Sequence, residues 1–236
     1  MKKSWKNLNI LTLIKKIVVI IFLITLSKVI FAAELHTKQW TVSTIIGSFS
    51  QNQKIKYYLE PQVRLIDDKY VFNQFFFLAG FGYQLTPAMV LFLGPSWILT
   101  KNTEGKIYHE YRLWEQLNWQ LINNSSILLN SRSRFEEKER SNQQQIAIQF
   151  RERLWARIPI KNIPLYYYSF FDEVFFNFNH PSWVSPYFFE QNRMFLGIAK
   201  QLTKTMMLDF GYLNQLQLGP PCQIDNVILL SVSITF

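Results

Sequence analysis

The chain has 236 residues, of which 49% are hydrophobic and 17% aromatic, and its formal net charge is +9. Six of its 25 basic residues lie within the first 33 positions, which hold no acid, so 19 basic residues face 16 acidic residues in the remainder. That near balance gives no indication of nucleic acid or another polyanion as a partner. The single cysteine, Cys222, excludes an internal disulfide.

Residues 1–33 have the organisation of a signal peptide. Five lysines precede an uncharged, mostly apolar run at 17–27, and Lys28 ends that run. A membrane-spanning helix needs about 20 apolar residues, so this run is too short, but its length is typical of the hydrophobic region of a signal peptide. We expect export through the Sec pathway and cleavage after Ala32 or Ala33; an uncleaved anchor is the alternative.

Residues 34–236 are expected to form a single all-β domain, because alternating runs of polar and apolar residues are separated by turn-rich breaks. The run at 53–65 is the clearest example, with Lys54, Glu60 and Arg64 on one face and apolar side chains on the other. In chain order, the predicted strands are 38–47, 53–65, 70–84, 89–100, 107–121, 127–137, 144–158, 165–177, 188–202, 206–218 and 226–236.

The last predicted strand, 226–236, has one apolar and one largely polar face. Every second residue from Ile228 to Phe236 is apolar, and three hydroxyl side chains alternate with them. After a signal peptide, such a strand ending on Phe236 predicts the closing strand and membrane-insertion signal of an outer-membrane β-barrel. A strand of a soluble β-sandwich has the same alternation and is the alternative.

The breaks between the strands fall into two classes. A tight turn at Asp67 and Asp68 follows the second strand. Beyond it, short turns at 86–87, 123–124, 159–164 and 203–205 alternate with loops at 101–105, 138–142, 178–186 and 219–225. Bacterial single-chain barrels have even strand numbers, short periplasmic turns and longer outer loops. We therefore predict a transmembrane antiparallel barrel of about 10–12 strands, ten of them over 53–236. The run 38–47 is then an extra strand, a plug or a cap, unless two strands have been fused elsewhere.

The polar faces of these strands carry charged residues that we expect to line the lumen, since a cation at the middle of the lipid face costs about 2–4 kcal/mol. The predicted lumen-lining residues are Glu60, Arg64, Glu110, Arg112, Arg132, Arg134, Glu136, Arg151, Arg153, Arg157, Glu173 and Arg193. Glu115 falls on the outward parity, which indicates either a position near the membrane interface or a β-bulge.

Two interpretations of this charged interior stay open. In the first, Arg and Glu on neighbouring strands pair and fill a narrow structural barrel. In the second, the excess of Arg lines a porin-like channel that favours small anions. A different class of function, an outer-membrane lipid-modifying hydrolase with a site at the barrel rim, is the alternative to both.

Catalytic and metal-binding motifs are not recognisable in the sequence. His36, His109 and His180 have no Ser or acid partner at a known spacing, although a distant partner would be invisible here. Neither a zinc-ligand spacing nor a glycine-rich phosphate loop is present, so we predict no catalytic residue, no metal and no cofactor. The expected partners are outer-membrane lipid and, during insertion, periplasmic chaperones and the barrel-assembly machinery. We expect a monomer that does not bind nucleic acid.

Five short motifs occur in a fixed order between Glu110 and Gln215. They are Glu110-x-Arg112-x-Trp114-x-Gln116, Arg151-x-Arg153-x-x-x-Arg157-x-Pro159, Asp172-Glu173-Val-Phe-Phe-Asn177, Gln191-Asn192-Arg193-x-x-x-Gly197 and Gly211-Tyr212-Leu213-Asn214-Gln215. In this order they resemble the uncharacterised bacterial family filed as domain of unknown function 2490, from Trp40 to Phe236. The resemblance implies an outer-membrane β-barrel of Gram-negative bacteria, and it supplies neither a substrate nor catalytic residues.

Overall fold

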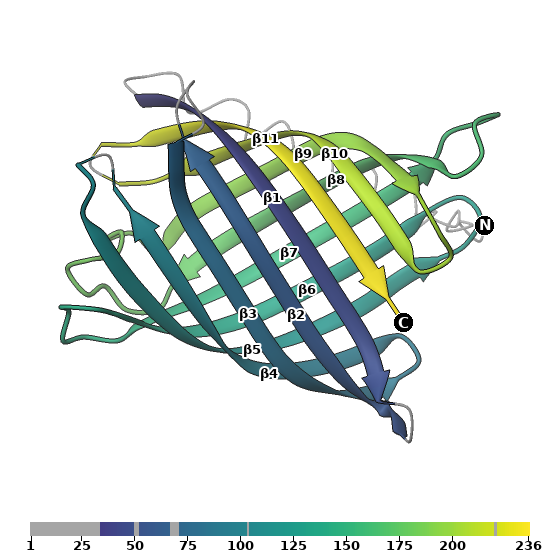
Figure 1. Cartoon of the computed structure of the whole chain (residues 1–236), viewed down its shortest axis with the longest axis horizontal. Helices are drawn as coiled ribbons and strands as arrows, with labels where there is room; N and C mark the ends of the chain where they lie inside the picture. Colours follow the sequence, from purple (N-terminus) through teal and green to yellow (C-terminus); the bar gives the residue numbers. More distant parts are fainter. Residues whose placement is uncertain (1–33, 50–51, 67–70, 103, 220) are drawn as a thin grey trace, which may run out of the picture. The chain divides into compact units, whose positions relative to one another are not determined.

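The computed structural model describes residues 34–49, 52–66, 71–102, 104–219 and 221–236. The predicted signal peptide and the turn at Asp67 and Asp68 lie outside these residues. Within the described part, the chain forms eleven strands and no helix, and the strands close into one barrel (Figure 1). Accordingly, no described segment forms a helix that is long and apolar enough to span a membrane.

The strands follow one another around the barrel in chain order, each antiparallel to the next. Their bounds are β1 Glu34–Phe49, β2 Asn52–Ile66, β3 Val71–Thr86, β4 Met89–Lys101, β5 Ile107–Asn123, β6 Leu128–Arg140, β7 Ala147–Pro159, β8 Tyr166–Asn177, β9 Phe189–Gln201, β10 Met206–Gln217 and β11 Gln223–Thr235. The ten strands predicted over 53–236 are confirmed, with ends that shift by at most three residues. The main shift is at β6, which continues through Arg140, so Lys138 belongs to the strand and not to a loop.

The barrel closes by pairing β1 with β11 in parallel. The run 38–47 lies within β1, a strand of the wall, so the extra-strand alternative is confirmed, the plug and cap alternatives are wrong, and no two strands were fused. The eleven strands of the described residues fall within the predicted 10–12, although the even number typical of bacterial single-chain barrels is not observed. The sheet is not antiparallel throughout, because an odd number of strands joined by hairpins leaves the first and last pointing the same way.

The parallel seam can be tested by a disulfide. Thr41 on β1 lies opposite Leu230 on β11, and neighbouring strands are about 4.8 Å apart, within the range that a disulfide spans. In a chain carrying Cys222→Ser, we expect Thr41→Cys with Leu230→Cys to crosslink on oxidation, seen as a gel-mobility shift that reductant reverses. Thr41→Cys with Ile234→Cys, which is four residues out of register, is the control and should stay uncrosslinked. Equal crosslinking of both pairs would contradict this register.

Side chains alternate between the lumen and the outside along each strand, as the sequence predicts. On β11, Asp225, Val227, Leu229 and Ser231 are buried, whereas Ile228, on the other parity, is exposed. Large apolar side chains cover the outer face: Phe77, Phe81, Leu91, Leu93, Leu113, Leu154, Leu196, Phe210, Tyr212 and Ile228 are all among the exposed residues. Phe81 exposes 68% of its surface, so the outer face presents a large exposed apolar surface.

Two aromatic clusters project into the barrel from different parts of the wall. One lies on β2–β5 and contains Tyr58, Phe92 and Trp114, with ring centroids 5.3–5.4 Å from Tyr58. The other spans β7–β11 and β1 and is built on stacked Phe171 and Phe195. Residues of the second cluster, including Trp40, Trp155 and Phe171, border the small space in the middle of the barrel together with charged side chains.

The two rims of the barrel differ. One end, here named the turn rim, carries the turns 87–88 and 202–205 and the connection 160–165. The opposite end, the loop rim, carries the connections 141–146 and 218–222 and the longer connection 178–188. Because the strand number is odd, β1 begins at the loop rim whereas β11 ends at the turn rim. The Phe236 amide still donates to the carbonyl of Ile46 on β1, at 2.9 Å.

Candidate functional site

The lumen holds two chambers separated by a layer of charged side chains. The loop-rim chamber has a volume of about 570 Å³ and is bordered by Asn102, Ser185 and Gln223 at the rim. The turn-rim chamber, about 310 Å³, is bordered by Pro87 and Thr235. Only a space of about 50 Å³ lies between them among the residues described. We name the charged side chains around this space the middle layer.

Glu173 on β8 is the centre of the middle layer. Its Oε1 accepts hydrogen bonds from Arg132 at 2.5 Å and from Arg151 at 2.9 Å, and its Oε2 lies 3.6 Å from Nη1 of Arg193. These arginines come from β6, β7 and β9, so one carboxylate joins strands on both sides of its own. Only 2% of Glu173 is exposed, and the surrounding guanidinium groups satisfy its charge in place of water.

Glu136 on β6 extends this network toward the loop rim. Its carboxylate accepts from Arg112 at 2.5 Å and from Arg151 at 2.9 Å, and Arg134 lies 3.4 Å away. Because Arg151 contacts both Glu136 and Glu173, the two carboxylates belong to one connected network. Such networks are more costly to break than isolated pairs, since each loss leaves a buried charge without a partner.

Glu60 on β2 connects the network to the opposite wall. Its carboxylate accepts a hydrogen bond from the Tyr58 hydroxyl, lies 3.8 Å from Nη1 of Arg132, and lies 4.0 Å from Nη2 of Arg134. Thr44 of β1 also donates to it, at 3.0 Å. The middle layer therefore spans the lumen, and side chains of β1, β2, β6, β7, β8 and β9 close it.

An ion pair outside this network lies beside the turn-rim chamber. Arg157 on β7 donates through Nε and Nη2 to both oxygens of Asp209 on β10, at 2.9 and 2.7 Å. The Ser169 hydroxyl adds a third donor to Asp209, at 2.6 Å. This bidentate pairing fixes the guanidinium group of Arg157 in one orientation. The pair thus joins β7 and β10, two strands that are not neighbours in the wall.

At the loop rim, ion pairs form within β5 and between neighbouring strands. Glu110 contacts Arg112 at 2.5 Å and Arg140 at 3.3 Å. Lys38 on β1 donates to Asp225 on β11 at 2.7 Å, across the parallel seam. Asp225 is fully buried, so this pair stabilises the closure of the barrel directly.

All twelve sequence-predicted lumen residues border these chambers. Glu110, Arg112, Arg134 and Glu136 border the loop-rim chamber, and Arg157 borders the turn-rim chamber. The other seven surround the middle space: Glu60, Arg64, Arg132, Arg151, Arg153, Glu173 and Arg193. Of these, Arg64, Arg151 and Arg193 also border the loop-rim chamber, and Arg132 and Arg153 also border the turn-rim chamber. Among the described residues, ion pairs connect the predicted residues with one another except Arg64 and Arg153, which have no ion pair, and Arg157, which pairs with Asp209.

Several site residues were missed. Lys38 and Asp225 were not recognised because the first strand was treated as a leftover and the last strand, which begins at Gln223, was predicted to begin three residues later, at Asn226. Asp209 lies on the inward parity of β10, a signal that could have identified it. Lys138 was assigned to a loop, although it lies on the same parity as Arg134 and Glu136.

His109 accepts a hydrogen bond from a neighbouring tryptophan. Trp97 donates from Nε1 to Nδ1 of His109 at 3.1 Å; since the indole nitrogen can only donate, Nδ1 is the acceptor. His36 borders the loop-rim chamber, and Nδ1 of His180 lies 3.3 Å from the Ser185 carbonyl.

Glu115, on the outer face of β5, lies opposite Leu93 and Phe135. The irregularity in β5 falls between Gln120 and Ile122, beyond Glu115, so a bulge does not explain its outward position. Within the described residues, no group of three or more His, Cys, Asp or Glu side chains has the geometry to hold a metal ion.

Comparison with known proteins gives a family but no activity. The model of the family described as "Protein of unknown function (DUF2490)" matches residues 37–221. An uncharacterised protein of Methylorubrum extorquens is 22% identical over 200 residues, which cover 84% of this chain and 86% of that protein. No solved structure matches the chain. The chain therefore belongs to the DUF2490 family, as its five ordered motifs predict.

Proposed function

We propose that the mature chain is an outer-membrane β-barrel that is closed at its middle layer and admits small anionic solutes into its loop-rim chamber. The observation that carries this proposal is the division of the lumen by the Glu60, Glu136 and Glu173 network into two chambers. The narrow structural barrel is then the closed state of this protein, and the channel that favours anions is its open state. The closed state is the one described, and opening requires the ion pairs to part.

The outer face supports membrane insertion. Its exposed side chains are mainly Phe, Leu, Ile and Tyr, and Phe236 stands at the turn rim with 66% of its surface exposed. Two outward carboxylates have local partners: Glu152 accepts from Ser131 and Ser133, at 2.6 and 2.5 Å, and Asp172 accepts from Asn192, at 2.6 Å. Such pairing lowers the cost of placing polar groups next to lipid.

The charge of the loop-rim chamber supports a preference for anions. Eight Lys or Arg side chains border it, against three carboxylates. The cations are Lys38, Arg64, Arg112, Arg134, Lys138, Arg140, Arg151 and Arg193, and the carboxylates are Glu110, Glu136 and Glu190. Excess charge of one sign in a cavity with apolar walls raises the local concentration of counter-ions. The expected partners remain outer-membrane lipid and the assembly machinery, and the expected state is a monomer.

Membrane fractionation and planar-bilayer recording test this function together. We expect the full chain to be exported and to fractionate with outer membranes. The refolded mature protein should insert into planar bilayers and show no steady conductance above the leak, because the middle layer blocks the lumen. A detergent-independent soluble protein would contradict the membrane assignment. Steady conductance of the unmodified protein would contradict the closed middle layer.

A further inference from the structure

Arg64 on β2 has an unusual environment within the loop-rim chamber. Its guanidinium carbon lies 3.9 Å from the ring centroid of Trp40 and 4.1 Å from that of Phe76, so aromatic rings stack on it from β1 and β3. Only 9% of the residue is exposed. This packing fixes the plane of the guanidinium and leaves its edge, where the N–H donors lie, to make polar contacts.

The donors of Arg64 reach only neutral groups. Nη1 donates to Gln74 at 3.3 Å and Nη2 to Gln62 at 3.1 Å, whereas Nε has no hydrogen-bond partner. Among the described residues, no carboxylate lies within 4 Å of Arg64. A buried cation without a counter-ion is destabilising, in contrast to Arg132 or Arg157, which are paired. Arg64 therefore presents a buried positive charge that no carboxylate of the described residues neutralises by direct contact.

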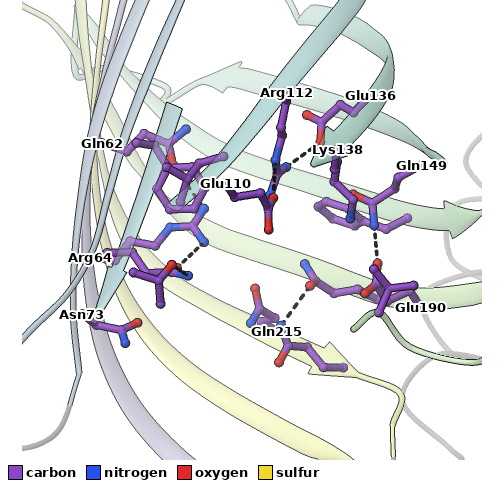
Figure 2. Close-up of a pocket in the computed structure, with 18 of the residues that line it drawn as sticks. Gln62, Arg64, Asn73, Glu110, Arg112, Glu136, Lys138, Gln149, Glu190 and Gln215 are labelled. Carbon is purple, nitrogen blue, oxygen red and sulfur yellow. Dashed lines mark hydrogen bonds and ion pairs between the residues drawn. The ribbon is translucent and has the colours of Figure 1, made fainter. Parts of the chain in front are cut away.

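Lys138 on β6 adds a second cation of this kind. It is 5% exposed, and no described carboxylate lies within salt-bridge distance of it. Its Nζ lies 5.9 Å from the ring of Trp183. In Figure 2, Gln62, Arg64 and Asn73 lie on one side of the chamber, and Lys138, Gln149 and Glu190 lie on the other. Both walls therefore present a cation beside side-chain amides.

We propose that the loop-rim chamber is a binding site for a small polyhydroxylated oxyanion, a sugar acid or a sugar phosphate, whose charged group pairs with Arg64. A guanidinium edge matches carboxylate and phosphate oxygens equally well. The amides of Gln62, Gln74 and Gln215 each use one N–H in a hydrogen bond within the protein and can offer the other to a hydroxyl group. The volume of about 570 Å³ falls in the range of about 300–1,000 Å³ of small-molecule sites. The binding site itself does not depend on the proposed function. Only the side of the membrane that the chamber faces rests on that function.

Binding to the refolded mature chain in detergent micelles tests the site without a membrane. The probes are glucuronate, glucose 6-phosphate and glucose, titrated calorimetrically in a phosphate-free buffer of low salt. Tryptophan fluorescence gives a second readout, since Trp40 and Trp183 border the chamber. We expect at least one of the two anionic probes to bind, and uncharged glucose to bind about tenfold more weakly or not at all. The stronger anionic probe identifies the oxyanion as carboxylate or phosphate.

Arg64→Gln should weaken binding of the anionic probe by about tenfold or more, the loss expected of one charge-assisted contact. Arg64→Lys should lie between Arg64→Gln and the wild type. Arg153→Gln is the matched control, because Arg153 also stacks on two aromatic rings and has no carboxylate of the described residues within 4 Å, but borders the other chamber. Its affinity should equal that of the wild type.

Three results would overturn the site: no binding of either anionic probe, equal binding by Arg64→Gln, or equal binding of glucose. Because the variant removes an uncompensated cation, folding should survive; heat-modifiable mobility on gels verifies it. The Arg64→Lys variant keeps the test decisive if Arg64→Gln does not fold. Failure of the conductance test would leave these binding results intact, so the two proposals fail separately.

Discussion

Replacing Glu173 by Gln should lower the free energy of unfolding by about 3–5 kcal/mol, the cost of breaking a buried ion network by removing one partner. The substitution keeps the shape of the side chain but removes the charge that Arg132, Arg151 and Arg193 share. These arginines lie on β6, β7 and β9, so their buried guanidinium groups lose the carboxylate that they share on β8. Equilibrium unfolding in urea, followed by tryptophan fluorescence in a fixed detergent or lipid, measures the loss.

Glu110→Gln is the matched control for this substitution. Glu110 also contacts two arginines, but Arg112 retains Glu136 at 2.5 Å, and 30% of the Arg140 side chain is exposed to solvent. We expect a loss of about 1 kcal/mol, close to that of exposed pairs. If the two variants lost equal stability, Glu173 would not be the centre of the network.

The same Glu173→Gln variant should also conduct. Loss of the shared carboxylate leaves three cations that repel one another at the narrowest part of the lumen, and their separation widens the passage. The added positive charge should make the conductance selective for anions, as reversal potentials in a salt gradient would report. A folded but silent variant would show that aromatic packing, and not the ion network, closes the lumen.

Alternation explains why so much of this site could be predicted from the sequence. A strand between lipid and lumen must separate polar from apolar residues at a period of two. That rule alone assigns Arg132 and Arg134, or Arg151 and Arg153, to one face. It needs no knowledge of neighbours, and it places charges correctly even where a strand end is uncertain by two or three residues.

The partners of these charges could not be predicted, because they depend on register and on curvature. Arg132 and Glu173 lie 41 positions apart, and Arg157 and Asp209 lie 52 apart. Neither pair lies on strands that neighbour each other. Side chains meet across the lumen only after strand tilt and stagger are set, and the sequence of one strand does not contain these quantities.

The pairing of β1 with β11, which closes the barrel, could not be predicted from the alternation of residues either. Nothing in 38–47 distinguishes a strand that pairs in parallel with β11 from one that stays outside the wall, since both would alternate. The prediction therefore left 38–47 open as an extra strand, a plug or a cap, and the structure shows the extra strand. The Lys38 and Asp225 pair, 187 positions apart, is the physical signature of the true closure.

An odd number of strands has a consequence for sidedness in the proposed outer membrane. β1 begins at the loop rim and β11 ends at the turn rim, so the two ends of the barrel should face opposite sides. With the turn rim in the periplasm, an epitope placed directly before Glu34 should be accessible to antibody on intact cells. An even-stranded barrel would hold that position in the periplasm, beside the carboxy-terminus.

Two further insertions calibrate this labelling. An epitope between Glu104 and Gly105 marks the loop rim, and one between Lys161 and Asn162 marks the turn rim. We expect the epitope before Glu34 to label like the loop-rim insertion, at least about tenfold above the turn-rim insertion, until cells are permeabilised. The comparison is relative, so it holds whichever rim faces outward. If the epitope before Glu34 labelled with the turn-rim insertion, β1 could not run parallel to β11, and the Lys38 and Asp225 pair could not form.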